Sequence, residues 1–332
     1  MIHFEIKAKF TPIEQDKNPE KWLELRTTGI GGSDAGAILG LNKYASPLTI
    51  YMAKKGVEGF KGNAATEWGH ILEDPIRKKA AEDLNIQICT VPGMYTSIEY
   101  PFMNANLDGL CHAENPVTIG GETVQGNGGH EIKTSSQGEG FTDDEIPDSY
   151  YCQVQHYMAV TGLDWFILTV FFMNTKKGKH YIIKRNNEFI YEKLIPTEKD
   201  FWENYVLKNV VPEPTGVDSE TEYLKSLPMD EVIQLDEETE SIISEEREID
   251  CQIKELNKKQ AELKNMILLK LAENSTGFDK AEKSTALCGK YKITYNSQSR
   301  KSVDSDALKK AGLYDSYCKE TVSKVMRISE VI

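Results

Sequence analysis

Asn106-Leu107-Asp108-Gly109-Leu110, followed by His130-Glu131-Ile132-Lys133, is the part of the sequence that decides the fold. An isolated acid precedes an acid-x-lysine triplet, and the acid and the lysine of that triplet share one face of a strand because side chains alternate along it. With Asp108 at the end of the preceding strand, two carboxylates can bind a hard cation while an ammonium group lies beside a phosphodiester. The pattern is typical of a metal-dependent nuclease.

We expect Asp108 and Glu131 to bind Mg²⁺ through oxygen atoms, with the carbonyl of Ile132 as a further ligand. Lys133 would orient or help to deprotonate the attacking water and would stabilise the charge that grows on the phosphate. An E-x-K triplet by itself is more often an exposed strand face with an acid-lysine pair. The surrounding motifs therefore have to decide between the two interpretations.

A helical pattern over residues 64–84 carries the third acid, Glu73. The apolar residues that give this pattern its spacing are Trp68, Ile71, Leu72, Ile76 and Ala80. Pro75 removes one backbone bond and crowds a carbonyl, so we expect the helix to kink or restart beside Glu73. A surface carboxylate near a kink is common, but packed behind the strand edge that carries Asp108 it would help to hold a second metal ion.

A second helix is expected over residues 149–161. Gln153 and Tyr157 are four residues apart and share one face of it, where an amide and a phenol can contact phosphate or the active-site lysine. We interpret His156 on the same helix as a satisfied core histidine rather than a catalytic one.

Near the N-terminus, a helix around residues 18–26 ends at Arg26 and leads into Gly29-Ile30-Gly31-Gly32-Ser33-Asp34. Ser33 is expected to cap a helix over residues 35–39. Free N–H groups at a helix N-terminus attract anions, and Arg26 can add a bidentate clamp. The alternative interpretation is a capped turn without a ligand.

We interpret residues 1–211 as a compact α/β unit. Its candidate strands cover residues 87–91, 102–107, 130–134, 165–173 and 179–184, with a Gly-rich hairpin or loop at 120–129 and a last helix at 198–209. Residues 212–239 are expected to be an acidic linker and residues 240–332 a C-terminal appendage. The net charge is -13, but most of the excess lies between residues 214 and 250, so the acidic balance does not exclude DNA as a substrate.

The appendage contains a short heptad pattern. Ile242, Ile249, Leu256 and Leu263 recur every seven residues, and Ile253, Gln260 and Ile267 follow four residues after the last three of these. The pattern predicts a seam with one polar position, in a coiled-coil arm or in a helix packed on its own domain. A strand at 290–295 and a helix at 303–313 should follow, with a basic bias from Lys290, Lys292, Arg300, Lys301, Lys309 and Lys310. We expect residues 240–332 to mediate self-association or a partner contact.

The sequence also predicts the compartment. The N-terminus lacks an apolar run with a cleavage site, and no segment approaches the roughly 20 apolar residues that span a bilayer, so we expect a cytosolic protein without a membrane anchor. Six cysteines are scattered without a C-x-x-C pair. They are interpreted as structural thiols, and an iron-sulfur cluster is not expected.

The motifs, taken in order, resemble those of the YqaJ-like viral recombinase family, which includes lambda-type exonuclease. They are Trp22-x-x-x-Arg26 with Gly29-Ile30-Gly31-Gly32-Ser33-Asp34-Ala35, Trp68-Gly69-x-x-x-Glu73, Asp108-Gly109-Leu110, Glu131-Ile132-Lys133 and Gln153-Val154-Gln155. The resemblance covers roughly residues 15–210. It implies an α/β restriction-endonuclease-like core of the PD-(D/E)XK class, a mixed central sheet flanked by helices, followed by a C-terminal helical and small α+β appendage.

The resemblance also implies roles for individual residues. Glu73, Asp108 and Glu131 match the metal-binding acids, and Lys133 matches the catalytic lysine. Arg26 and Ser33 match the pocket for the terminal 5′ phosphate, to which we assign Asn106 as well.

The function that the resemblance implies is a phage or prophage exonuclease that uses Mg²⁺, with Mn²⁺ able to substitute. It would digest one strand of double-stranded DNA from its 5′ end, in the cytosol of a bacterial host. The 3′ single-stranded product would pass to a single-strand annealing recombinase, and a ring-shaped homotrimer is implied. The alternatives are an endonuclease of the same fold, which would cut closed circular duplex, and a DNA-end-binding recombination accessory protein without catalysis.

Overall fold

The computed structural model describes residues 2–14, 17–56, 64–227, 233–274, 283–296, 303 and 305–318. The chain divides into two units, Met1–Leu227 and Pro228–Ile332. This division lies inside the segment expected to be a linker, because α7 (Asp218–Ser226) belongs to the first unit.

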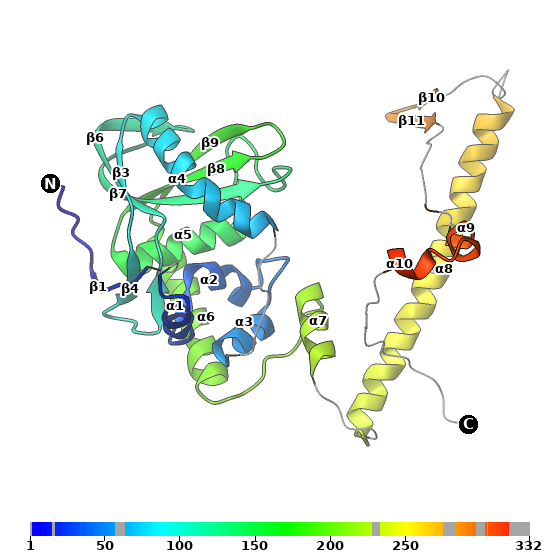
Figure 1. Cartoon of the computed structure of the whole chain (residues 1–332), viewed down its shortest axis with the longest axis horizontal. Coiled ribbons are helices and arrows are strands. Elements are labelled where there is room, and N and C mark those ends of the chain that lie inside the picture. The colour runs from blue at the N-terminus through cyan, green and yellow to red at the C-terminus, as the bar shows by residue number, and fades with distance from the viewer. Residues whose placement is uncertain are drawn as a thin grey trace. The chain divides into compact units, whose positions relative to one another are not determined.

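A mixed five-stranded sheet forms the centre of the first unit (Figure 1). In spatial order its strands are β3 (Gln87–Cys89), β6 (Gly109–Ile119), β7 (Glu122–Ser135), β8 (Trp165–Phe172) and β9 (Lys177–Lys184). β7 and β8 run parallel, and the other three neighbouring pairs are antiparallel. The predicted α/β class with a mixed central sheet is confirmed.

Two helices pack on opposite faces of this sheet. On one face α5 (Asp148–Thr161), which connects β7 to β8, bonds to Glu131 through Gln153. On the other face α4 (Ala64–Leu84) packs on β3, β7 and β8. The side chain of His130 points to that second face, since neighbouring strand residues alternate. It bonds Thr169, which in turn bonds His180.

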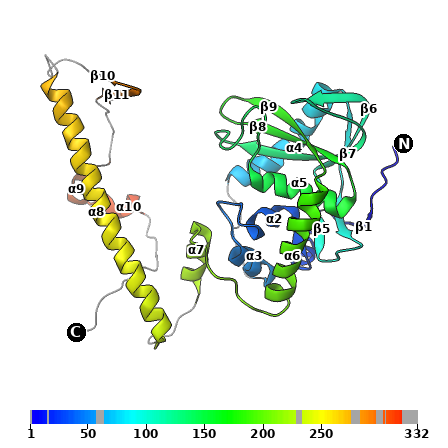
Figure 2. The same cartoon turned by 180° about the vertical axis from the view of Figure 1, so that it is seen from behind.

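A smaller sheet carries the N-terminal motifs, as Figure 2 shows from behind. In spatial order its strands are β1 (Ala8–Pro12), β4 (Gly93–Ser97), β5 (Met103–Ala105) and β2 (Ile30–Gly31). The helices beside it are α1 (Pro19–Thr27), α2 (Gly32–Ile38) and α3 (Pro47–Lys54). β2 pairs with β5 in parallel, which brings the glycine motif close to α5.

His156 of α5 is the satisfied core histidine that we predicted. It is fully buried, Nδ1 lies 2.8 Å from an oxygen of Glu198, and Nε2 lies 2.9 Å from the Asn104 carbonyl. The negative charge of Glu198 raises the pKa of His156, although its burial alone would lower it. The pair ties α5 to the small sheet and to α6 (Ile195–Asp200).

The Gly-rich stretch at 120–129, expected as a hairpin or loop, is a hairpin whose second arm belongs to β7. The hairpin between β6 and β7 turns at Gly120 and Gly121, whose φ angles are 58° and 82°. Gly128 and Gly129 lie inside β7, where an added Cβ would be only 2.3 Å from the ring of Trp165 and 2.2 Å from that of Phe166. These glycines allow aromatic side chains of β8 to lie against the backbone; they do not interrupt the strand.

The helix expected over residues 64–84 does not restart at Pro75, because α4 continues through the proline. Ile76 and Ala80 are buried against the sheet and hold the helix beyond that point. Trp68 and Ile71, which we expected on the apolar face, are 54% and 55% exposed.

The helix predicted over residues 198–209 begins earlier than expected. A π-helical segment, η1 (Phe189–Leu194), precedes α6, and a second one, η2 (Phe201–Val206), follows it. Each π turn adds a residue and shifts the apolar spacing away from 3.6, which hides the helix from a search by periodicity.

The second unit contains the predicted long helix and the small α+β part. They are α8 (Glu237–Glu273), β10 (Lys283–Cys288), β11 (Tyr291–Asn296), α9 (Ser305–Lys310) and α10 (Tyr314–Tyr317). Arg300 and Lys301, named for the basic bias, lie outside the described residues. Within the described ranges, no helix has the length and hydropathy needed to span a membrane.

Candidate active site

Strand pairing brings Asp108 to the E-x-K triplet. Asp108 directly precedes β6, and Gly109 faces His130 on β7. The Oδ2 atom of Asp108 accepts a hydrogen bond from the backbone N–H of Ile132 (2.7 Å). Arg77 of α4 donates through Nε to the carbonyl of Asp108 (3.0 Å), which fixes the helix to the same point.

Glu131 is the most buried acid of this group, with 2% of its surface exposed. Its Oε1 atom accepts hydrogen bonds from Lys133 Nζ and from Gln153 Nε2, both at 2.7 Å. Its Oε2 atom is buried and has no hydrogen-bond partner among the described residues. Because a buried carboxylate oxygen is unfavourable without a donor or a cation, this atom is a suitable metal ligand.

Burial perturbs all three acids, and repulsion by Asp108 adds to this effect at Glu131 and Glu73. Burial, with the charge of Asp108, raises the pKa of Glu131 to about 8. Burial also raises the pKa of Asp108, and burial followed by the charge of Asp108 raises that of Glu73. A divalent cation would relieve this repulsion. Burial alone would lower the pKa of Lys133, but Glu131 and Asp108 outweigh it and keep the ammonium charged.

The residues fit a hard cation held by two carboxylates. Mg²⁺ in proteins is usually bound by one or two carboxylates together with water, and Asp108 and Glu131 supply these. Glu73 is turned toward His70, whose Nδ1 lies 3.0 Å from Glu73 Oε1. In keeping with this, no group of three His, Cys, Asp or Glu side chains in the described part of the chain is arranged to hold a metal ion.

Gln153 and Tyr157 share one face of α5, as expected, and are joined by a hydrogen bond from Gln153 Nε2 to the Tyr157 hydroxyl (2.9 Å). Gln153 contacts Glu131 rather than Lys133, so its amide holds the acid in place. Burial raises the pKa of Tyr157 well above its usual value, and the charges of Glu131 and Asp108 add to this effect.

Arg26 and Ser33 lie together, but Ser33 does not cap the helix. Arg26 Nη2 donates to the hydroxyl of Ser33 (3.2 Å). The N-cap of α2 is Gly31, whose N–H donates to Oδ2 of Asp34 (2.9 Å). The predicted cap is wrong because the acid three residues after Gly31 fills that role.

Asp34 lies between two cations. Its carboxylate is 2.6 Å from Lys54 Nζ and 3.6 Å from Arg26 Nη2. Burial alone would raise the pKa of Asp34, but Lys54 and Arg26 outweigh it and lower the pKa. Two cations beside one carboxylate leave a net positive charge next to Ser33. No sequence pattern had singled out Lys54.

Gly32 connects this cationic pocket to the acids. A Cβ at Gly32 would lie 2.4 Å from the ring of Tyr157, so glycine allows α2 to approach α5 closely. A continuous series of contacts therefore links Ser33 to Glu131. Gly32, next to Ser33, packs on Tyr157, and Gln153 donates hydrogen bonds to both Tyr157 and Glu131.

Asn106 lies between β5 and β6, two residues before Asp108. Its Nδ2 donates to the carbonyl of Gly93 (3.3 Å). This bond holds the amide against β4, and a role at the phosphate pocket stays a prediction.

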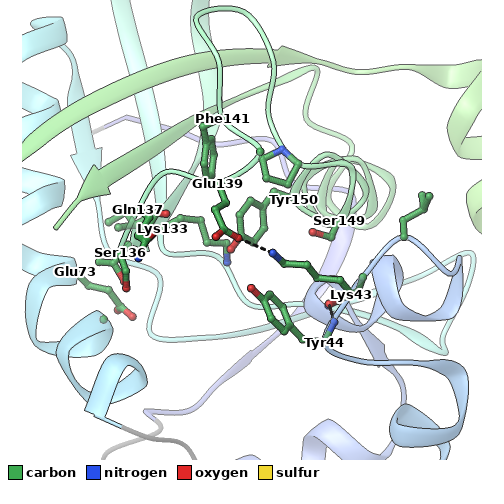
Figure 3. Close-up of a pocket in the computed structure, with 18 of the residues that line it drawn as sticks. Lys43, Tyr44, Glu73, Lys133, Ser136, Gln137, Glu139, Phe141, Ser149 and Tyr150 are labelled. Carbon is green, nitrogen blue, oxygen red and sulfur yellow. Dashed lines mark hydrogen bonds and ion pairs between the residues drawn. The ribbon is translucent and has the colours of Figure 1, made fainter. Parts of the chain in front are cut away.

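A groove of about 960 Å³ opens beside Lys133 and Glu73 (Figure 3). Lys43 and Tyr44 lie on one side of it, and Lys43 Nζ is 2.7 Å from an oxygen of Glu139 on the other. Tyr44 is 71% exposed, and the ring centre of Tyr150 is 5.1 Å from Lys133 Nζ. Sequence reasoning missed these residues: Lys43, Tyr44 and Glu139 lie in turns without a periodic pattern, and Tyr150 lies in the first turn of α5, away from the face of Gln153 and Tyr157.

Helix α7 holds the loop that carries Lys43 and Tyr44. Ser219 donates through Oγ to the carbonyl of Tyr44 (3.0 Å). Glu220 is 1% exposed and accepts from the backbone N–H of Gly216 (2.7 Å). Burial raises the pKa of Glu220, but bonds from Ser46 and its other donors outweigh this effect and lower it. A segment expected to be a linker thus supports one wall of the groove.

Comparison with known families decides the assignment of this domain. Residues 21–164 match the family model of the YqaJ-like viral recombinase domain. This part of the chain is similar to the YqaJ-like viral recombinase domain. The predicted family is therefore confirmed, and the matched YqaJ-like segment contains every residue assigned to the site, from Arg26 to Tyr157.

Individual proteins are also similar to this YqaJ-like chain. "Uncharacterized protein YqaJ" of Bacillus subtilis (strain 168) is 29% identical over 98% of both chains. An alkaline exonuclease (LHK-Exo) from Laribacter hongkongensis is 19% identical, with a TM-score of 0.40 over 62% of this chain and 96% of its own. A phage related exonuclease from Haemophilus somnus 129PT is 14% identical, with a TM-score of 0.40 over 57% of this chain and 99% of its own.

Proposed function

We propose that the YqaJ-like domain is a divalent-metal-dependent deoxyribonuclease that digests one strand of duplex DNA from its 5′ end. The observation that carries the proposal is the run of contacts from Arg26 and Ser33 through Tyr157 to Glu131. It puts a pocket with positive charge within a few side chains of an acid-lysine centre. The product would be a 3′ single-stranded tail for a strand-annealing recombinase.

Asp108 and Glu131 would hold Mg²⁺, or Mn²⁺ in its place, with the Ile132 carbonyl and Glu73 as further ligands. The ion would supply Lewis acidity toward the phosphate oxygens and the attacking water. Lys133, kept charged by its neighbours, would orient that water and stabilise the charge on the phosphate. Gln153 would keep Glu131 oriented while Lys133 acts.

The pocket around Arg26 and Ser33 would bind the terminal 5′ phosphate and fix the distance to the first scissile bond. In the groove, Tyr44 and Tyr150 offer aromatic faces on which bases can stack, and Lys43 could exchange Glu139 for a backbone phosphate. Both features suit an enzyme that starts at an end and then follows one strand.

The choice of substrate tests this proposal directly. Linear duplexes with 5′-phosphate or 5′-hydroxyl ends, each strand labelled in turn, are incubated with Mg²⁺ or with a chelator. We expect the strand with the 5′ phosphate to shorten only when Mg²⁺ is present. Rapid cutting of covalently closed circles would favour the endonuclease, and shortening from the 3′ end would contradict the polarity.

Two substitutions separate catalysis from end recognition. Lys133→Ala should abolish digestion of every duplex. Arg26→Ala should remove the preference for a 5′ phosphate while slow digestion continues. Lys21→Ala, an exposed cation on the same helix as Arg26, serves as the matched control and should behave as the unaltered protein. Unchanged end preference in Arg26→Ala would contradict the pocket.

We also propose that the protein acts as a homo-oligomer, with a ring-shaped trimer of the first unit as the specific expectation. Sedimentation equilibrium of the purified chain measures this number. The residues that carry the nuclease activity are proposed to lie within residues 1–211, with α7 supporting the groove and the appendage at 240–332 serving assembly or partner contact.

A further inference from the structure

Helix α8 (Figure 1) is long and bears an apolar stripe. The described part of the chain leaves this stripe exposed. The stripe consists of Ile242, Ile249, Ile253, Leu256, Leu263 and Ile267. Each of these side chains is between 46% and 65% exposed, and no residue of α8 is buried. Most helices in proteins depend on packing of an apolar face for their stability, so a partner is needed here.

The spacing of the stripe fixes which residues would meet across a helix pair. In a heptad, positions a and d form the seam, while e and g flank it. Position d is occupied by Ile242, Ile249, Leu256 and Leu263, and position a by Glu246, Ile253, Gln260 and Ile267. The charged flanking residues are Glu245, Asp250, Lys259 and Lys264.

A parallel pair of α8 helices would bring like charges together. Each a residue would meet its own copy, which places Glu246 against Glu246 in the seam. On the flanks, Glu245 would lie beside Asp250 of the second copy, and Lys259 beside Lys264. Contact between two Gln260 side chains is the one polar contact in favour of this arrangement.

An antiparallel pair avoids these conflicts when Ile242 faces Ile267 of the second copy. The other seam contacts are then Glu246 with Leu263, Ile249 with Gln260 and Ile253 with Leu256. On the flanks, Asp250 lies beside Asn257, and Gln252 beside Lys259. Sliding by one heptad either way would place Asp250 against Asp250 or Lys259 against Lys259, but it would also pair Glu245 with Lys259 or Asp250 with Lys264. Sliding would leave only six of the eight seam positions paired, so overlap of the whole stripe favours the register in which Ile242 faces Ile267.

The distribution of charge along α8 supports the same orientation. Residues 237–250 contain seven acids and one arginine, whereas residues 254–270 contain five lysines and two acids. In an antiparallel pair the acidic part of one helix lies along the basic part of the other, and the two helix dipoles oppose. We propose that α8 pairs antiparallel with α8 of a second copy of this chain, over about 39 Å of helix.

Disulfide formation between single cysteines tests the orientation in the full-length chain. Two variants, Ile242→Cys and Ile267→Cys, are made with the exposed Cys89, Cys251, Cys288 and Cys318 replaced by serine, and one carries a size tag. We expect a cross-linked dimer of tagged and untagged chains when the two are mixed and oxidised. Each variant alone should give little cross-linked dimer, because the new cysteines of the two paired copies would be about 37 Å apart. Efficient cross-linking of either variant with itself would overturn the antiparallel arrangement.

A second measurement tests the pairing itself. The double variant Ile253→Glu with Leu256→Glu puts charge into the middle of the seam, and Asn265→Glu adds one at an outer position of the same helix. By sedimentation equilibrium, we expect the mass of the assembly to halve in the double variant and to stay unchanged in Asn265→Glu. An unchanged mass in the double variant would overturn the proposal. Neither experiment depends on nuclease activity, so the proposed function and this pairing can fail separately.

Discussion

The acid centre should release a proton when it binds a divalent cation. Burial and Asp108 raise the pKa of Glu131 to about 8, so below that pH a proton competes with the metal for the same carboxylate. Because the ionised fraction of such a group rises from about 1% at pH 6 to about half at pH 8, the apparent affinity should increase about 50-fold over this range. Above pH 8 it should increase less than about two-fold per pH unit.

Binding of Mn²⁺ to the DNA-free protein provides the assay, since free Mn²⁺ is measured directly by electron paramagnetic resonance. Calorimetry in buffers of different ionisation enthalpy gives the number of protons released. Glu131→Gln should lose both the strong binding and the pH dependence. Glu139→Gln is the matched control, because Lys43 lowers the pKa of Glu139 and its carboxylate is already charged. An affinity that is constant from pH 6 to pH 8 would refute the reasoning.

Three further substitutions test other parts of the structure. Gln153→Ala removes one of the two donors to Glu131 Oε1 and should weaken Mn²⁺ binding by about 10- to 100-fold, whereas Gln137→Ala, an exposed residue of the groove, should not. Gly129→Ala should lower stability by about 1–3 kcal/mol in chemical denaturation because its Cβ would meet Phe166, while Gly178→Ala, with open space, should not. Glu220→Ala leaves buried donors unpaired and should cost about 2–3 kcal/mol, in contrast to the exposed Glu213→Ala. The pKa of Glu220 in the folded protein lies below 4.5, so the stability lost in Glu220→Ala should be full at neutral pH and should shrink as the pH falls below 4.5. A stability difference between the two proteins that does not change with pH would count against this explanation.

Short-range patterns predicted much of the central sheet. Glu131 and Lys133 could be placed on one face because side-chain alternation is a local rule. The strand that brings Asp108 to them, β6, was not predicted, and the strand expected before Asp108 is β5 of the small sheet. The helix at 149–161 was found from spacing alone, and it contains Gln153 and Tyr157 on one face. These elements have a single dominant periodicity.

Other features depended on contacts between distant segments. The glycines at 120–129 were assigned to a hairpin or loop, but Gly128 and Gly129 lie within β7 because Trp165 and Phe166 of the neighbouring strand pack against them. Lys54 is twenty residues away from Asp34 in the sequence, and its role follows only from how α2 and α3 pack. No periodicity of either partner could reveal such a pair.

Helix α7 belongs to the first unit, although the acidic composition of this segment suggested a linker. An excess of acids between residues 214 and 250 suggested an acidic linker over residues 212–239. Glu220 is instead buried and accepts hydrogen bonds from the backbone N–H groups of Thr215 and Gly216. Its neighbour Ser219 donates a hydrogen bond to the carbonyl of Tyr44. The number of acids in a segment indicates how strongly they repel one another. It does not show whether hydrogen-bond donors surround one of the carboxylates. Since those bonds hold the loop of Lys43 and Tyr44, the functional boundary of the groove lies after α7, and any shortened chain that ends at Pro214 would lose support for a wall of its own candidate site.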